Sequence, residues 1–451
     1  MKNIQNNNQE TILSLLNIVP GDRFFLSVES KNITYAEIVN ISNRFIDENS
    51  QYLGCNIAVK FKNRELATKF LPAVSYLAKN LLILPDDLQE EIEQDFFIKT
   101  QSNYHFNFNE AGVEITKISE PVFDGLKRKM ILATSGTTGT PKLVSYELKQ
   151  LIGTAKTDIA KGLAYNWALV YDVNRFAGLQ VYFQTILSGS KLTILESDSS
   201  IAQVINLLIN SNANCLSATP SFFRKLLMDP KSASINFTRI TLGGEIAEQT
   251  ILNSLKTIYP QAKIIHIYAS TEAGVGFSVK DVKEGFPLAF LDETALLGTS
   301  LKIKDGTLWI KSKNTSNTMI SGLLELDMDG YINTGDLVAI VDDRILFMGR
   351  ESGTINVGGN KVIPEEIERV ILKHDAISEC YVFGKKNSMM GMLVACEVVL
   401  KDPSIDKNYI KKDLQSFCHT QLQPFKVPAL VKFVSEIEKN SVGKVMRGKA
   451  S

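Results

Sequence analysis

Residues Ile131 to Lys142 read ILATSGTTGTPK, an apolar run followed by a loop of small and hydroxylated residues that closes on a lysine. The apolar run from Met130 to Ala133 is typical of a buried β-strand. Glycines let the loop turn its N–H groups inward, hydroxyl groups add donors, and Lys142 adds a positive charge. A site for polyphosphate oxygens needs these groups. The spacing does not fit the P-loop motif G-x-x-x-x-G-K-[ST], and the alternative interpretation is a flexible surface loop.

Predicted strands and helices alternate on both sides of this loop. Upstream, Asn56–Phe61 and Asn80–Leu84 are predicted strands around a helix over Glu65–Leu77, and a capping box at Thr34 and Glu37 begins an earlier helix. Downstream the alternation continues through residues 201–300. This order predicts an α/β fold with parallel sheets and right-handed crossovers, in which ligands bind beyond the carboxyl ends of the strands. Residues 86–125 give no clear pattern.

The pattern changes after residue 286. Between 286 and 348 the helical period disappears, and short apolar runs alternate with Asp-Gly and Asp-Asp turns, which indicates a small β-barrel. The last hundred residues mix strands and helices again, as in a small α+β domain. We therefore expect parallel-sheet α/β subdomains, a small β-barrel and a separate C-terminal domain.

Composition excludes several classes of protein. The 451 residues carry equal numbers of acidic and basic side chains and 44% hydrophobic residues, so nothing indicates nucleic-acid binding. The first residues lack a signal peptide, and no apolar stretch is long enough to span a membrane. The five cysteines are scattered without C-x-x-C spacing, and the four histidines form no ligand-like cluster. A cytoplasmic protein without a resident transition metal is expected.

The loop from Thr134 to Lys142 resembles the phosphate loop of the adenylate-forming (AMP-binding) enzymes. This superfamily contains acyl-CoA synthetases, peptide-synthetase adenylation domains and luciferases. Four further stretches resemble its other signatures in the same order: Tyr268-Ala269-Ser270-Thr271-Glu272, Thr334-Gly335-Asp336, Gly349-Arg350, and Gly443-Lys444. Together they cover the chain from about residue 30 to Lys444. The turn Gly243-Gly244-Glu245 is weak alone, but in relatives it lines the adenine pocket.

The resemblance implies roles for individual residues. Lys444, Thr271 and Glu272 would be catalytic, with Glu272 binding Mg²⁺, a hard cation that prefers carboxylate oxygen. Asp336 would accept hydrogen bonds from the ribose hydroxyls, and the Tyr268 ring would pack on adenine. The implied nucleotide-binding set is Thr134, Ser135, Gly136, Thr137, Thr138, Gly139, Lys142, Gly243, Gly244, Glu245, Tyr268, Ala269, Asp336 and Arg350.

The turn Leu169 to Gln180 corresponds to the segment that borders the acid substrate in relatives. Arg175 takes the place of their aromatic or His residue, and Ala177 and Gly178 follow it in the implied substrate pocket. Arg175 is either a cation that faces the carboxylate or another polar group of the acid, or a surface arginine in a salt bridge. Amino-acid-activating relatives place an Asp where Ala177 stands here, which disfavours an α-amino acid.

Some positions depart from the family pattern. Leu143 and Ala269 replace glycines, and Ser352 stands where relatives have the Asp or Lys of the hinge. The Ala269 methyl group is expected to narrow the acid pocket. The resemblance divides the chain into an N-terminal domain over 1–349, with the β-barrel near 286–348, a hinge at 350–353, and a mobile C-terminal domain over 354–451.

The implied function is ATP-dependent activation of a small carboxylic acid to an acyl-adenylate, with release of pyrophosphate and then transfer to a thiol. ATP and Mg²⁺ are the implied cofactors, and the thiol belongs to CoA or to the phosphopantetheine of a carrier protein. One alternative is a stand-alone adenylation enzyme that loads an aryl or amino acid onto a carrier protein. The other is a nucleotide-binding homologue that has lost catalysis.

Overall fold

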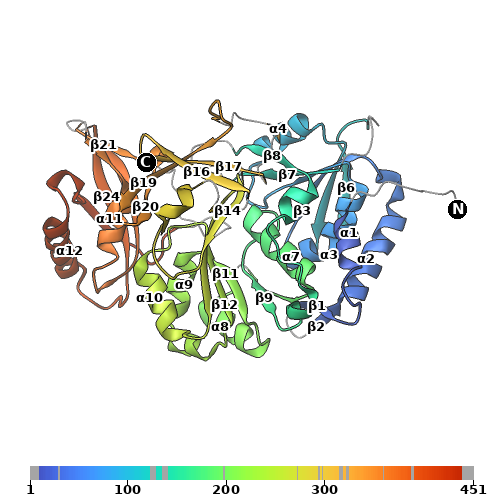
Figure 1. Ribbon diagram of the computed structural model, residues 1–451, viewed down its shortest axis with the longest axis horizontal. Helices are drawn as coiled ribbons and strands as arrows, with labels where there is room; N and C mark the ends of the chain where they lie inside the picture. Colours follow the sequence, from blue (N-terminus) through green and yellow to red (C-terminus); the bar gives the residue numbers. More distant parts are fainter. Residues whose placement is uncertain are drawn as a thin grey trace.

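The computed structural model describes residues 10–28, 31–121, 128–134, 141–196, 199–271, 273–292, 295–296, 298–313, 318–320, 325–358, 360–387 and 391–438. These residues form four β-sheets, with helices packed on them. Figure 1 shows the N-terminal helices at one end of the molecule and the C-terminal sheet with its helices at the other. The loop residues 135–140, Glu272 and the segment 439–451 lie outside the described residues.

The first sheet contains the strands on either side of the glycine-rich loop. Its order is β18-β8-β7-β4-β3-β5-β6, in which β7, β4, β3 and β5 run parallel and the others antiparallel. The glycine-rich loop joins two adjacent antiparallel strands, with Ala133 opposite Leu143. The strands are β3 (Asn56–Phe61), β4 (Asn80–Ile83), β5 (Tyr104–Asn109), β6 (Gly112–Lys117), β7 (Lys129–Ala133), β8 (Leu143–Tyr146) and β18 (Thr318–Met319).

The second sheet has the order β14-β13-β12-β11-β9-β10-β1-β2, with the antiparallel strands β14 and β2 at its edges. The parallel strands at its centre are buried along most of their length, as expected for strands covered on both faces. The strands are β1 (Phe24–Val28), β2 (Lys31–Thr34), β9 (Asn166–Leu169), β10 (Lys191–Ile194), β11 (Cys215–Ala218), β12 (Arg239–Gly243), β13 (Lys263–Ser270) and β14 (Gly274–Val279).

The helices begin at residues that the sequence marks as caps. Thr34 accepts a hydrogen bond from the Glu37 N–H and Glu37 reaches back to the Thr34 N–H, so the predicted capping box is confirmed. The helices of the two α/β sheets are α1 (Ile12–Leu16), α2 (Tyr35–Glu48), α3 (Arg64–Leu77), α4 (Glu90–Thr100), α5 (Leu148–Ile152), α6 (Ile159–Gly162), α7 (Phe176–Ser188), α8 (Ile201–Asn210), α9 (Pro220–Leu227) and α10 (Gln249–Ile258). Among the described residues, three apolar cores lie between these helices and the sheets, and the smallest contains the buried apolar residues of α4.

The region predicted as a small β-barrel is an antiparallel sheet of order β15-β20-β19-β17-β16. Its strands are β15 (Phe286–Pro287), β16 (Thr299–Lys304), β17 (Thr307–Ser312), β19 (Ile332–Val341) and β20 (Arg344–Arg350). Its apolar core includes residues of β13 and β14, so this sheet is packed onto the carboxyl end of the second sheet.

The C-terminal part has its own sheet and its own core. Strand β24 pairs with β21 and β23 antiparallel and with β25 in parallel, and helices α11 and α12 cover it. A single 3₁₀ turn, Glu351–Gly353, joins β20 to β21. The elements are β21 (Ile355–Val357), β22 (Asn360–Val362), α11 (Pro364–Ile371), β23 (Ile377–Asn387), β24 (Gly391–Leu400), α12 (Lys407–Gln421) and β25 (Leu430–Phe433).

The α/β fold class and its order of parts are confirmed. Residues 86–121, for which no elements were predicted, hold α4, β5 and β6. The β5 strand does alternate, with Phe106 and Phe108 buried and the asparagines between and after them less buried, so the sequence analysis missed a period-two signal there. The predicted helix after Leu148 is short and ends at Ile152. Among the described residues, no helix has the length and apolar character needed to cross a membrane.

Candidate active site

The carboxyl end of β13 connects the separate parts of the candidate site. Tyr268 lies two residues before the end of this strand, and its hydroxyl group donates a 2.5 Å hydrogen bond to Oδ2 of Asp336 on β19. Three residues later, the carbonyl oxygen of Thr271 accepts a hydrogen bond from the Tyr146 hydroxyl group on β8. One short segment therefore contacts both the antiparallel sheet and the strand that follows the glycine-rich loop.

Asp336 and Arg350 lie opposite each other on neighbouring strands. The β19–β20 register pairs the two residues, and Arg350 Nε donates to Asp336 Oδ1 at 2.8 Å. Asp336 is only 8% exposed, and each of its carboxylate oxygens accepts from a different residue. A carboxylate held in this way is a strong acceptor for neutral hydroxyl donors such as those of a ribose.

The Tyr268 ring belongs to a stack of aromatic side chains. It lies nearly parallel to Phe277 and to Phe347, with both centroid distances at 5.2 Å. Burial and the neighbouring Asp336 carboxylate raise the pKa of Tyr268 well above its ordinary value, so the hydroxyl group remains a donor. Part of the ring surface that the resemblance assigns to adenine is thus already in contact with phenylalanine.

The described ends of the glycine-rich loop are tied together. The Thr134 N–H donates to the Lys142 carbonyl oxygen at 2.8 Å, and the Lys142 N–H donates to Thr134 Oγ1 at 3.0 Å. Thr134 is 5% exposed, and this pair continues the β7–β8 ladder by one step. The predicted phosphate-binding residues Ser135, Gly136, Thr137, Thr138 and Gly139 lie outside the described residues.

The Gly243-Gly244-Glu245 turn follows β12 on the same rim. Gly244 has φ +82°, a left-handed conformation that glycine adopts without strain. The Gly243 carbonyl oxygen accepts a 3.4 Å hydrogen bond from Tyr171, which follows β9, and burial raises the pKa of Tyr171. Glu245 Oε2 accepts from the Ser221 N–H at the start of α9, so this carboxylate stabilises a helix N-terminus.

Arg175 is not a surface arginine. It is 8% exposed, and its Nη2 pairs with Asp87 Oδ1 at 2.5 Å. Asp87 follows β4 of the first sheet, whereas Arg175 precedes α7, so the ion pair joins the carboxyl-end rims of two sheets. A second pair in the same turn joins Asp172 to the buried Arg64 at 2.9 Å. Burial raises the pKa of Asp172, and Arg64 opposes this effect.

Gly178 has a structural role that the sequence did not indicate. A Cβ atom at this position would lie 2.1 Å from the Asp172 carbonyl oxygen, so only glycine allows the first turn of α7 to approach that backbone. Ala177, beside it, is half-buried against the first apolar core. Both residues shape the turn that holds Arg175.

Two predicted catalytic residues, Glu272 and Lys444, lie outside the described residues, and Ala269 is exposed at the end of β13. The structure also adds residues that the sequence analysis did not select: Tyr146, Tyr171, Phe277, Phe347 and Asp87. For Asp87 a signal existed, because it stands in a Pro-Asp-Asp turn directly after a strand, on the rim where ligands are expected.

Comparison with known proteins identifies the family. Residues 84–317 match the model of the AMP-binding enzymes, and residues 366–444 match the model of the AMP-binding enzyme C-terminal domain. The chain belongs to the AMP-binding enzyme family. It is an AMP-forming acid–thiol ligase, which activates an acid as an acyl-adenylate before transferring it to a thiol. The adenylate-forming resemblance is confirmed.

Among curated relatives, a 2-succinylbenzoate–CoA ligase of Listeria innocua is 24% identical over 71% of this chain and 68% of its own length. Among solved structures, ATP-bound MatB from Rhodopseudomonas palustris superimposes with a TM-score of 0.78 at 19% identity, covering 97% of both chains. The o-succinylbenzoate coenzyme A synthetase of Bacillus subtilis, in complex with ATP and a magnesium ion, gives 0.74 at 19% identity over 98% of this chain and 99% of its own. At these identities, the structural likenesses show the fold.

Proposed function

We propose that this enzyme activates a small carboxylic acid with ATP and Mg²⁺, releases pyrophosphate, and transfers the acyl group to CoA. The observation that carries this proposal is the β13 end, where Tyr268 contacts the Asp336–Arg350 pair and Thr271 contacts the strand after the glycine-rich loop. A ribose contact and a phosphate contact at the two ends of one segment fit a single nucleotide.

The proposed reaction requires electrostatic stabilisation of charge, and it does not require a nucleophilic residue of the protein. A carboxylate must approach the α-phosphate of ATP, and the barrier is largely the approach of an anion to a polyanion. Lys142 and Lys444 would stabilise the transferring charge, and Asp336 with Arg350 would hold the ribose. Asp336 fits this role because it is buried and already accepts two hydrogen bonds. Glu272 would bind Mg²⁺, which supplies positive charge to the phosphates when bound.

The acid is proposed to bind near the start of α7, where Arg175 lies at the carboxyl ends of the strands of both α/β sheets. Curated relatives act on 2-succinylbenzoate, and one from Rhodococcus jostii acts on an indenyl propanoate. Arg175 Nε is buried, and within the described part of the chain no hydrogen-bond partner is found for it. A donor of this kind supports an acid with a further polar group within reach. The Ala177 position, which lacks a carboxylate, supports a substrate without an α-ammonium group.

CoA is proposed as the acceptor because the relatives named above are CoA ligases, and a carrier protein is the second candidate. We propose that the reaction takes place in the cytoplasm, and the five cysteines, which are free and buried as in proteins of reducing compartments, support this.

Pyrophosphate exchange across a panel of aryl, fatty, hydroxy and amino acids tests the proposal, followed by thioester assays with CoA and with purified carrier proteins. An inactive homologue would bind nucleotide without any acid-dependent exchange. Replacing Lys444 with alanine should reduce exchange while thioester formation from a supplied acyl-adenylate continues. Equal loss of both steps would refute the role proposed for Lys444.

A further inference from the structure

An arginine on helix α11 of the C-terminal part contacts the antiparallel sheet β15-β20-β19-β17-β16 and the turn that precedes it. Arg369 Nη2 donates a 2.8 Å hydrogen bond to the carbonyl oxygen of Phe347 on β20, and it lies 3.4 Å from Glu284 Oε1. The neighbouring α11 residues Ile367 and Ile371 are buried in the C-terminal core. Arg369 is therefore attached to the C-terminal part, but it donates a hydrogen bond to one residue of the N-terminal part and forms an ion pair with another.

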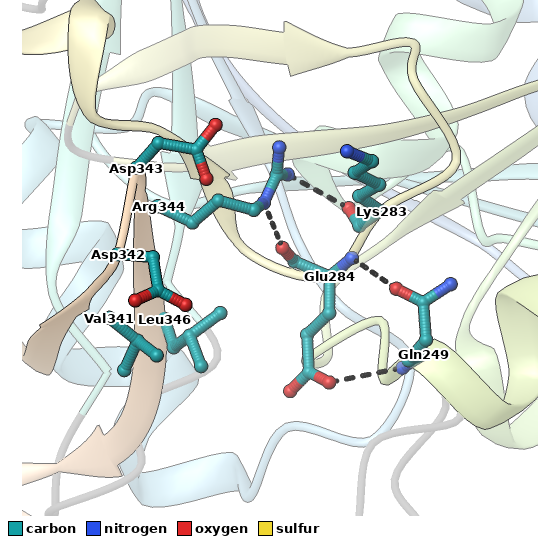
Figure 2. A pocket seen from close by; sticks show the side chains of 8 residues that line it. All are labelled: Gln249, Lys283, Glu284, Val341, Asp342, Asp343, Arg344 and Leu346. Carbon is teal, nitrogen blue, oxygen red and sulfur yellow. Dashed lines mark hydrogen bonds between the residues drawn. The ribbon is translucent and has the colours of Figure 1, made fainter.

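Glu284 is held in a fixed position, as Figure 2 shows. Its Oε2 accepts from the Gln249 N–H at 3.1 Å, its own N–H donates to Gln249 Oε1 at 3.0 Å, and its carbonyl oxygen accepts from Arg344 Nε at 2.8 Å. Arg344 also donates to the carbonyl oxygens of Lys283 and Gly285. Within the same turn, Val282 has φ +60°, a strained conformation for a β-branched residue. Several contacts thus fix a strained turn whose carboxylate faces Arg369.

The second acceptor leads directly to the nucleotide pocket. Phe347, whose carbonyl oxygen Arg369 binds, stacks its ring on Tyr268, and Tyr268 donates to Asp336. Two residues further along β20, Gly349 has φ +146°, and a Cβ atom there would lie 2.5 Å from Ile363 Cγ2. The end of β20 and the start of α11 are therefore closely packed at the point where the chain leaves the antiparallel sheet.

We propose that Arg369 is a positioning residue, which sets the orientation of the C-terminal part against the nucleotide pocket by binding Glu284 and the Phe347 carbonyl together. A guanidinium group with two acceptors at fixed positions defines an orientation better than a flexible ammonium group does. The expected effect on nucleotide binding rests on the proposed function, because it requires that the nucleotide binds where the C-terminal part meets the antiparallel sheet.

The chain supplies a matched control. Lys225 on α9 and Glu379 on β23 form another ion pair between the same two parts, at 3.3 Å. Lys225→Gln removes a comparable charge contact without touching Phe347 or Glu284. Glu284→Gln probes the proposed contact from the opposite side, because the amide oxygen still accepts from the Gln249 N–H.

The experiment measures amide hydrogen exchange of residues 345–357 and AMP affinity in the full-length protein. Arg369→Gln removes a charge-assisted hydrogen bond, and it should speed exchange of this segment and weaken AMP binding about ten-fold. Glu284→Gln removes only the ion pair, and it should change both readouts in the same direction, with AMP binding weakened about three-fold. Arg369→Lys should restore part of both, and Lys225→Gln should change AMP affinity less than about two-fold. In Arg369→Gln combined with Glu284→Gln, the second change should add little to the first.

The assignment is overturned if Arg369→Gln affects AMP affinity no more than Lys225→Gln does. It is also overturned if exchange rises equally throughout the C-terminal sheet, which would indicate loss of folding. Neither readout needs acid turnover, so an enzyme that activates no acid would refute the proposed function while hydrogen exchange still decides the role of Arg369.

Discussion

The nucleotide side and the acid side of the candidate site are built in different ways. On the nucleotide side, Tyr268, Asp336 and Arg350 come from three signature stretches and contact each other directly. On the acid side, Arg175 and Asp172 pair with Asp87 and Arg64, which belong to no signature. The proposed nucleotide contacts can therefore be selected from signature residues, whereas the proposed acid side depends on pairs of residues that are distant in sequence.

The two sides also differ in what their charges do. Asp336 is paired with Arg350 and Tyr268, and both of these partners are themselves proposed to contact the nucleotide. The Arg175–Asp87 pair neutralises an arginine that could otherwise face an anion, and it ties together two sheets. This comparison predicts that changes on the nucleotide side affect binding first, and that changes on the acid side affect stability and acid selection together.

The largest expected effect is that of Asp336→Ala on nucleotide binding. The change leaves Arg350 and Tyr268 without their shared acceptor and removes the acceptor proposed for the ribose, and each hydrogen bond to a charged group contributes about 1.5–3 kcal/mol. AMP affinity measured by calorimetry should fall about a hundred-fold. The control is Asp329→Ala, which removes an exposed carboxylate that pairs with Lys302 near the same sheet. Similar affinities for the two variants would contradict the proposed ribose contact.

Gly178→Ala tests whether the acid side is as tightly packed as its contacts indicate. The new methyl group would meet the Asp172 carbonyl oxygen, and overpacking of this kind destabilises proteins by about 1–3 kcal/mol. Thermal unfolding should begin at a lower temperature. Gly353→Ala is the matched control, because no atom lies within 4 Å of a Cβ atom built there. Unchanged melting of Gly178→Ala would show that the turn can shift.

Arg175→Gln compared with Asp87→Asn separates the two interpretations of the arginine. Both changes break the same ion pair, so the structural loss should be similar in the two variants. If Arg175 also contacts the acid, only Arg175→Gln should raise the KM for the acid, by about ten-fold for one lost charged hydrogen bond. The KM for ATP should change little. Equal acid KM values in both variants would leave Arg175 with the ion pair alone.

Much of the fold was predictable because local signals agreed with it. The capping box at Thr34, the strand Asn56–Phe61 and Pro364 in the first turn of α11 all appear where the sequence indicates. The helix α4 was not predictable, since it buries only Phe96, Phe97 and Thr100 and exposes most of its other residues, whereas the alternation of β5 that follows it was a signal that the sequence analysis missed. A helix with so narrow an apolar face gives a weak periodic signal.

The candidate site was predictable only as far as its signatures reach. The resemblance selected Asp336, Arg350 and Tyr268, and the structure places them in contact. It gave no information on the stacking of Phe347 against Tyr268 or on the partner of Arg175, because these contacts join residues 79 and 88 positions apart. The spacing of residues along the chain does not indicate such pairs, because these contacts form only when the sheets are arranged in the folded protein.

The smallest expected effect concerns pH, and it distinguishes the two sides again. His266 lies on β13 just before Tyr268, and its Nε2 is 3.0 Å from the Lys283 carbonyl oxygen. Burial lowers the pKa of His266 below its ordinary value. The Lys283 carbonyl oxygen and the carboxylates of Asp281 and Glu284 oppose this effect, because they favour the charged imidazole. The arginine–aspartate pairs of the acid side include no group that ordinarily titrates near neutral pH.

Because its folded pKa is lowered, the unfolded chain takes up the His266 proton first as the pH falls. Stability should therefore decrease below about pH 6.5, until the pH passes the folded pKa, and it should show no contribution from this group at pH 8. Half-buried His105 also has a pKa lowered by desolvation and adds to the same trend. His266→Gln keeps a donor for the Lys283 carbonyl oxygen but removes the titration. Above pH 7, the melting temperature of this variant should depend on pH in the same way as that of the wild type. Between pH 6.5 and 5, it should fall less steeply than that of the wild type. An identical slope in both proteins would mean that the imidazole near the nucleotide side is not held neutral by burial.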